Sequence, residues 1–102
     1  MSRDHATVLG CRVDAVDAGE AVRRIVSLAT AGQAPAVVVT LGTEMAMRAR
    51  RDERFRQTVN ASALSLCDTV GIQVAARAQG VRIPARVTGI DLIEPLCAVL
   101  AA

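Results

Sequence analysis

Short apolar runs alternate along the chain with longer stretches in which apolar residues recur at helical spacing. The clearest run, AVVVTL at residues 36–41, is continuous and β-branched, which predicts a strand covered on both faces of a parallel sheet. ALSLC at residues 63–67 predicts a second buried strand. Residues 6–13 mix apolar and polar positions around Gly10, which predicts one or two short strands with a bend.

Helices are predicted between and after these strands. The first helix, with apolar positions from 21 to 29, is expected to end at Gly32. The helix after the second buried strand is expected to end at Gly80, and the last helix is expected to run to Ala102. Each predicted helix follows residues whose side-chain oxygens can cap its first turn. These candidate caps are Asp17 with Glu20, Thr43, Asp52, Asp68, and Thr88 with Asp91.

The alternation of strand and helix predicts right-handed βαβ units and an α/β fold of the Rossmann-like kind, with a mainly parallel sheet and flanking helices. A sheet of only about three strands would leave a bare edge, which complete domains normally cover. We therefore expect residues 1–102 to be an incomplete domain that continues beyond Ala102. The same bare edge makes a homo-oligomer an expected partner state.

Composition excludes several classes of protein. With 52% hydrophobic and 22% charged residues, the chain has the composition of a globular protein. Its only aromatic residue, Phe55, gives no platform for stacked bases, so nucleic acid is not an expected partner. Three separated cysteines and one histidine, His5, argue against a zinc site or disulfide framework, and His5 is assigned no role. No run approaches the roughly 18 apolar residues of a membrane span, which favours a cytoplasmic protein.

All twelve basic residues are arginine, and five of them crowd into residues 48–56. This basic segment has two interpretations, contact with phosphates or an anionic membrane surface, and an ordinary solvated helical face. Because Asp52 and Glu53 interrupt the segment, the solvated face is favoured at this stage.

Candidate chemistry lies where the two buried strands are predicted to end. Thr40 and Asp68 occupy these positions, and ligands of open α/β sheets collect outside the carboxyl ends of the strands. If the strands are neighbours, the hydroxyl and the carboxylate face one crevice. Two interpretations of Asp68 stand side by side, a catalytic carboxylate and a helix cap worth about 1 kcal/mol. Thr40, taken alone, is more simply an ordinary β-branched strand residue.

Four blocks of the sequence resemble the WecG/TagA/CpsF glycosyltransferases: LGCRVDAVDAGEAV (9–22), VVVTLGTEM (37–45), LSLCDTVGI (64–72) and PARVTGIDL (84–92). The resemblance spans nearly all of the chain but less than half of the expected family length, so it implies the amino-terminal part of a single glycosyltransferase domain. Two family patterns, T-x-N-x-E and D-G-x-G, are matched at Thr40, Glu44, Asp68 and Gly71. Gly42 stands where the family usually has Asn, and Thr69 stands where it usually has Gly.

The resemblance implies an N-acetylmannosaminyltransferase-like enzyme that moves N-acetylmannosamine, its uronate or a hexose from a UDP-sugar to a polyprenyl-diphosphate-linked acceptor, with inversion. Products would be teichoic acid linkage units, enterobacterial common antigen or exopolysaccharide.

Asp68 would be the general base. The matching positions Thr40, Gly42, Glu44 and Gly71 would bind substrate. Arg86, which matches the family's third block, would contact phosphate; a solvent-facing loop arginine is the equal alternative.

The implied partners are the UDP-sugar, the lipid-linked acceptor and, peripherally, the inner face of the cell membrane. No D-x-D pair is present, so neither a metal nor another cofactor is expected. We expect the 102 residues not to turn over substrate alone. The alternative is a noncatalytic α/β interaction module or an inactive fragment of such an enzyme.

Overall fold

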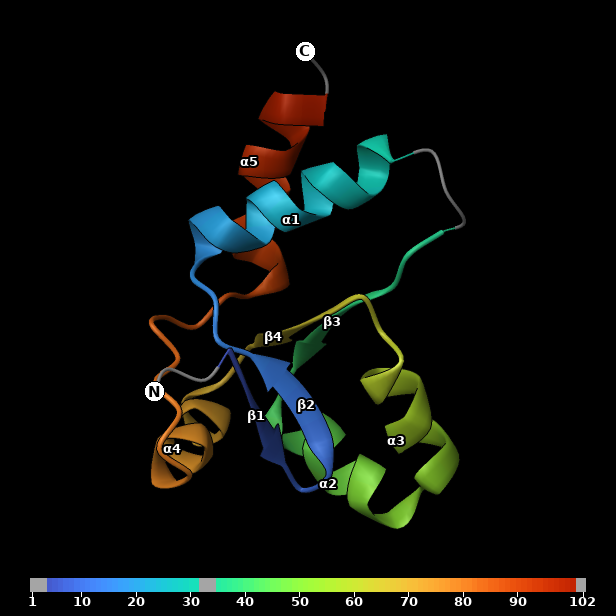
Figure 1. Ribbon diagram of the computed structural model, residues 1–102, viewed down its shortest axis with the longest axis vertical. Coiled ribbons are helices and arrows are strands. Elements are labelled where there is room, and N and C mark those ends of the chain that lie inside the picture. Colours follow the sequence, from blue (N-terminus) through green and yellow to red (C-terminus); the bar gives the residue numbers. More distant parts are fainter. Residues whose placement is uncertain (1–3, 32–34, 101–102) are drawn as a thin grey trace.

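A computed structural model of the chain describes residues 4–31 and 35–100. Its elements are β1 (His5–Val8), β2 (Cys11–Asp14), α1 (Ala18–Thr30), β3 (Val38–Leu41), α2 (Thr43–Arg51), α3 (Glu53–Asn60), β4 (Leu64–Cys67), α4 (Val70–Ala78) and α5 (Gly89–Leu100). Figure 1 shows α1 and α5 packed together on one side of the strands and α2, α3 and α4 on the other side. The predicted mixture of helices and strands is confirmed.

β1 and β2 form an antiparallel hairpin in which Val8 pairs with Cys11. The two residues between them, Leu9 and Gly10, have φ of 50° and 83°. Positive φ at both central residues is what a type I′ hairpin turn requires. The bend predicted around Gly10 is therefore confirmed, and it separates two strands.

β3 and β4 are parallel neighbours, with Val39 opposite Ser65 and Leu41 opposite Cys67. The α2 and α3 helices connect the two strands. All four residues of β4 are buried, whereas β3 alternates between half-buried and buried positions. The predicted pair of buried strands is thus found, with β3 less completely covered than its sequence indicates.

The prediction of one mainly parallel sheet is wrong for the described strands, which form two sheets of two strands each. The tight turn at Leu9 and Gly10 returns β2 antiparallel to β1. β2 lies beside β4, and there the Ser65 amide donates to the Asp14 Oδ2 atom at 2.8 Å. The Asp14 side chain thus replaces a backbone-to-backbone hydrogen bond between β2 and β4. The result is a mixed α/β domain with short sheets, and a Rossmann-like sheet is not confirmed.

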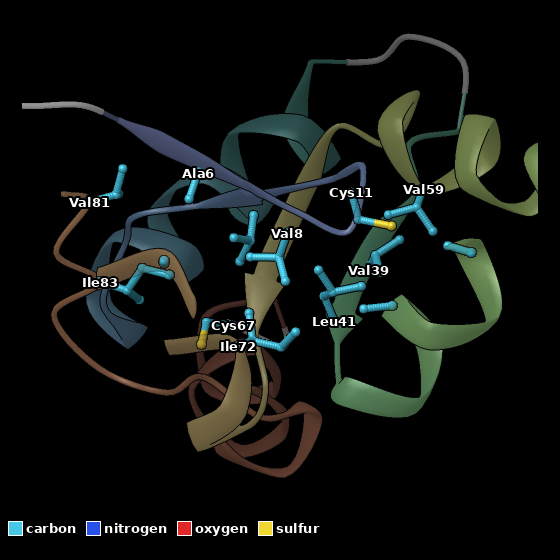
Figure 2. Close-up of a cluster of buried hydrophobic side chains, with 14 residues drawn as sticks. Ala6, Val8, Cys11, Val39, Leu41, Val59, Cys67, Ile72, Val81 and Ile83 are labelled. Atoms are coloured by element: carbon cyan, nitrogen blue, oxygen red, sulfur yellow. The ribbon is translucent and has the colours of Figure 1, made fainter. Parts of the chain in front are cut away.

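The core has two clusters of buried hydrophobic side chains, one on each side of the parallel pair. The larger cluster, drawn in Figure 2, lies among the hairpin, the parallel strands and α2 to α4. The smaller cluster lies under α1 and α5, and its buried members are Val16, Ala21, Leu64, Leu66, Val87 and Leu92. The parallel strands β3 and β4 are therefore packed on both faces, which fixes the position of their ends.

Most predicted helix caps are confirmed. The Glu20 amide donates to Asp17 Oδ1 at 2.8 Å, and the Phe55 amide donates to Asp52 Oδ1 at 3.0 Å. Around the start of α5 the capping is reciprocal, because the Thr88 amide donates to Asp91 Oδ2 at 3.1 Å and the Asp91 amide to Thr88 Oγ1 at 3.2 Å. Beyond the end of α4, Gly80 has φ of +83°, as expected of a residue that ends a helix.

Two predicted caps are wrong by one residue. Thr43 is the first residue of α2, and Gly42, in extended conformation, is its N-cap. Asp68 does not cap α4, because Thr69 holds that position and accepts from the Ile72 amide. The predicted helix end at Gly32 and the continuation of the last helix to Ala102 lie outside the described residues. Of the helices the structure describes, none has the length and hydropathy needed to cross a bilayer.

Candidate active site at the carboxyl ends of β3 and β4

β3 and β4 end side by side, and the chain on each strand continues into a helix. Beyond the last ladder pair, the Asp68 amide donates to the Leu41 carbonyl at 3.0 Å, so Asp68 still lies against β3. A Cβ placed on Gly42 would lie 3.6 Å from Asp68 Oδ2. Thr40, which is opposite Leu66, is two residues earlier. The structure therefore places Thr40, Gly42 and Asp68 at the same end of the parallel pair, as expected for strands that are neighbours.

Thr40 and Asp68 also fall on one face of the parallel pair. Side chains alternate between the two faces along a strand. The larger cluster receives Val39, Leu41 and Cys67, and the smaller cluster receives Leu64 and Leu66, with Val38 packed against it. By this alternation, Thr40 and Asp68 project toward the side of α1 and α5, just past the apolar residues that cover the pair.

The Asp68 side chain is half-buried and does not cap α4. Thr69 Oγ1 accepts from the Ile72 amide at 3.4 Å and supplies the α4 cap in its place. Within residues 4–31 and 35–100, no group donates a hydrogen bond to the Asp68 carboxylate, and no cation pairs with it. Both carboxylate oxygens are therefore free to accept a proton or a hydrogen bond from a ligand. Of the two interpretations of Asp68, the helix cap is wrong.

The beginnings of α2 and α4 approach closely next to this carboxylate. Thr43 Oγ1 and Thr69 Oγ1 lie 3.0 Å apart. A Cβ on Gly71 would lie only 2.8 Å from Thr43 Oγ1, closer than real Cβ contacts come. Gly71 thus permits the close approach of the two helices, a structural reason for glycine that the sequence alone does not reveal.

Arg86 lies on the other side of the β4 strand end. The Val87 amide donates to the Cys67 carbonyl at 2.7 Å, which ties residues 86 and 87 to the last residue of the strand. Burial raises the pKa of the Cys67 thiol; a hydrogen bond to the Thr69 backbone lowers it, the nearby Asp68 charge raises it and the Arg86 charge lowers it. The charges of Asp68 and Arg86 therefore both affect the pKa of Cys67, although Asp68 and Arg86 form no ion pair with each other among the described residues.

Glu44 is placed differently from the other predicted site residues. It is exposed in the first turn of α2 and lines a surface hollow with other residues of that helix. No contact connects Glu44 directly to Asp68 in the part of the chain that the structure describes. The connection runs through its neighbour Thr43, which lines the same hollow and contacts Thr69.

A partly buried polar network that joins β2 to β4 and to the end of α3 was missed by sequence reasoning. Arg12 Nε lies 3.4 Å from Asp14 Oδ1, and the other Asp14 oxygen accepts from the Ser65 amide of β4. The Arg12 guanidinium also donates to the carbonyls of Asn60 at 3.0 Å and Ser62 at 2.8 Å. The available signal was the alternation of Arg12, Val13 and Asp14 in a short strand, which puts two opposite charges on one face.

Taken together, these residues define an α/β protein whose candidate active site is a free carboxylate at the ends of two parallel strands. Among the described residues, no three His, Cys, Asp or Glu side chains gather as a metal site. The model of the glycosyl transferase WecG/TagA/CpsF family matches residues 6–102, so the chain belongs to this family of glycosyltransferases. The resemblance inferred from the sequence is thereby confirmed. A comparison with curated proteins gave no match.

Proposed function

We propose that the protein transfers a sugar from a UDP-sugar to a polyprenyl-diphosphate-linked acceptor, inverting the anomeric centre, with Asp68 as general base. The observation that carries this proposal is the position of the Asp68 carboxylate, which lies at the ends of β3 and β4 without a hydrogen-bonding partner among the described residues. Membership of a glycosyltransferase family supplies the class of reaction.

In the proposed reaction, the acceptor hydroxyl oxygen attacks the anomeric carbon and forms the new glycosidic bond. Its proton passes to the Asp68 carboxylate as the bond between the anomeric carbon and the UDP oxygen breaks. UDP leaves with the bonding electron pair on the opposite face of the sugar, which inverts the centre. Gly42 suits this step because it places no side chain over Asp68 Oδ2.

The neighbouring residues take supporting parts in the proposal. Thr40 shares the face of Asp68, and its hydroxyl would position the sugar or acceptor by hydrogen bonding. Charge grows on the departing diphosphate, and a guanidinium stabilises such charge through paired hydrogen bonds. Arg86 is the proposed guanidinium because it lies beside the end of β4. Gly71 keeps the two helix starts close to the site.

The donor would carry N-acetylmannosamine, its uronate or a hexose, and the product would enter teichoic acid, common antigen or exopolysaccharide synthesis. Because the acceptor is anchored to lipid, we propose peripheral contact with the inner face of the cell membrane. Self-association through the short sheets is a further part of the proposal.

A transfer assay tests this function. The full-length protein is incubated with a panel of UDP-sugars and a soluble analogue of a diphosphate-linked acceptor, and UDP release and the anomeric configuration of the product are measured. We expect transfer from one donor class with inversion. Retention of configuration would overturn the single-displacement mechanism. Absence of transfer with every donor would overturn the assignment of the protein as an enzyme and favour a noncatalytic α/β module.

A further inference from the structure

The outer face of α2 carries a hollow of about 420 Å³. This volume lies in the range of about 300 to 1,000 Å³ typical of small-molecule sites. The hollow is lined by Thr43, Glu44, Met47, Arg48, Arg51 and Asp52. The opposite face of the helix packs Ala46 and Ala49 into the core, so the orientation of the helix, and with it the position of the hollow, is fixed.

The arginines of this α2 hollow are not neutralised by the protein. Arg48 has Glu44 four residues before it and Asp52 four residues after it, a spacing at which helical ion pairs form. Neither pair is made, and no carboxylate in the described ranges lies within 4.0 Å of Arg48 or Arg51. The Asp52 carboxylate instead accepts from the Phe55 amide.

Arg48 is instead held by an aromatic ring. Its guanidinium carbon lies 4.8 Å from the centroid of Phe55, the only aromatic residue in the chain. A cation–π contact of this kind restrains the guanidinium, and none of its N–H groups donates a hydrogen bond to a described residue. An oriented guanidinium loses less entropy when it binds a phosphate than a mobile one, because part of the ordering has already taken place.

The charge of the lining changes along the helix, from Glu44 at its start to Arg48 and Arg51 further along, where Asp52 also lines the hollow. Its first residues, Thr43 and Glu44, lie next to the strand ends, where Thr43 contacts Thr69 at 3.0 Å. Arg48 and Arg51 lie at the other end, and a rise of 1.5 Å per residue places Arg51 about 10 Å along the axis from Glu44. A sugar linked to a diphosphate has the matching chemistry, with hydroxyl groups at one end and negative charge at the other.

The geometry of β4 separates this hollow from Arg86. The Asp68 amide faces β3, which leads into α2, whereas the Cys67 carbonyl faces the opposite edge and accepts from Val87. The peptide unit between Cys67 and Asp68 thus faces β3 on one side and residues 86 and 87 on the other.

We propose that the α2 hollow binds the diphosphate-linked sugar of the acceptor, with Arg48 and Arg51 holding the diphosphate and Thr43 and Glu44 contacting the sugar. The assignment to the acceptor rests on the proposed function. The binding of a diphosphate by Arg48 and Arg51 does not, and it is measured without turnover.

The test is calorimetric titration of the full-length protein with inorganic pyrophosphate and, separately, with UDP. The double variant Arg48→Gln/Arg51→Gln is compared with Arg50→Gln/Arg54→Gln, which removes two exposed arginines of α2 and α3 that do not line the hollow. Charge-assisted hydrogen bonds to phosphate predict a loss of pyrophosphate affinity of about tenfold or more in the first variant only. Equal losses in both variants would show a general surface field and overturn the site.

Two further arms identify the source of the phosphate. UDP affinity should be unchanged in the Arg48/Arg51 variant, while the KM for the acceptor rises about tenfold or more at constant donor KM. A loss of UDP affinity would assign the hollow to the donor and contradict the proposal. Sedimentation with vesicles of phosphatidylcholine and phosphatidylglycerol gives the last arm. Loss of vesicle binding with pyrophosphate affinity intact would show a lipid-surface contact and contradict it as well.

Discussion

The hydroxyl oxygens of Thr43 and Thr69 lie 3.0 Å apart and join the first turn of α2 to the cap of α4. The contact ties the two strand ends together across the candidate site. It also explains why Asp68 is free, since Thr69 performs the capping that an aspartate at the end of a strand would otherwise perform. Thr69 thus has a local structural role.

Replacing Thr69 with alanine should destabilise the fold. The change removes the side-chain cap of α4 and the contact with Thr43, and loss of a threonine cap costs about 1 kcal/mol. The free energy of unfolding from urea titration measures the effect. Thr58→Ala is the matched control, because Thr58 is exposed within α3 and bonds only to a carbonyl of its own helix. An equal effect in the two variants would contradict the capping role.

Gly71→Ala and Gly89→Ala should have opposite effects. Alanine normally stabilises a helical position by about 0.5 to 1 kcal/mol relative to glycine. At Gly89, the first residue of α5, an added Cβ meets nothing within 4 Å, so stabilisation or no change is expected. At Gly71 the added Cβ meets Thr43 Oγ1 at 2.8 Å, which should cost about 1 to 2 kcal/mol. Stabilisation by both variants in thermal unfolding would refute the close approach.

Asp14→Ala should destabilise the protein by about 3 kcal/mol. The change leaves the buried Ser65 amide without its acceptor and Arg12 without its anionic partner. Asp4→Ala is the control, because the Asp4 side chain is 89% exposed. Chemical unfolding of both variants provides the comparison. A loss below about 1 kcal/mol for Asp14→Ala would mean that the network does not hold β2 against β4.

The cap of α5 should weaken in acid. The Thr88 backbone and side-chain hydrogen bonds lower the pKa of Asp91 below its ordinary value of 3.8. A depressed pKa in the folded state means that this stabilisation is present above about pH 4 and is lost as the pH falls through the lowered value. NMR titration of the Asp91 carboxyl carbon should give a pKa below 3.8, and a value at or above 3.8 would contradict the reciprocal cap.

Local patterns predicted the strands and most helix starts because both depend on neighbouring residues. Continuous β-branched residues identified β3, and carboxylates just before apolar positions identified the caps at Asp17 and Asp52. At Asp68 the local pattern failed by one residue. The Asp68 amide continues the pairing of β4 with Leu41, so α4 begins one residue later and Thr69 becomes the cap.

The arrangement of the sheets was beyond local patterns. The contact that joins β2 to β4 links Asp14 with Ser65, which are 51 residues apart, and nothing in the sequence near either residue identifies its partner. The position of Arg86 depends in the same way on a hydrogen bond between Val87 and Cys67. By contrast, the placement of Thr40 and Asp68 at one end of the parallel pair followed from topology, since the carboxyl ends of neighbouring parallel strands lie at one edge.

The most direct test of the central claim is the rate of sugar transfer by full-length Asp68→Asn beside that of the unchanged protein. Because asparagine nearly preserves the shape of aspartate and Asp68 does not cap α4, the free energy of unfolding should stay within about 0.5 kcal/mol. Transfer should fall by about two orders of magnitude or more, as expected for loss of a general base. Transfer at the unchanged rate by a fully folded variant would show that Asp68 is not the base.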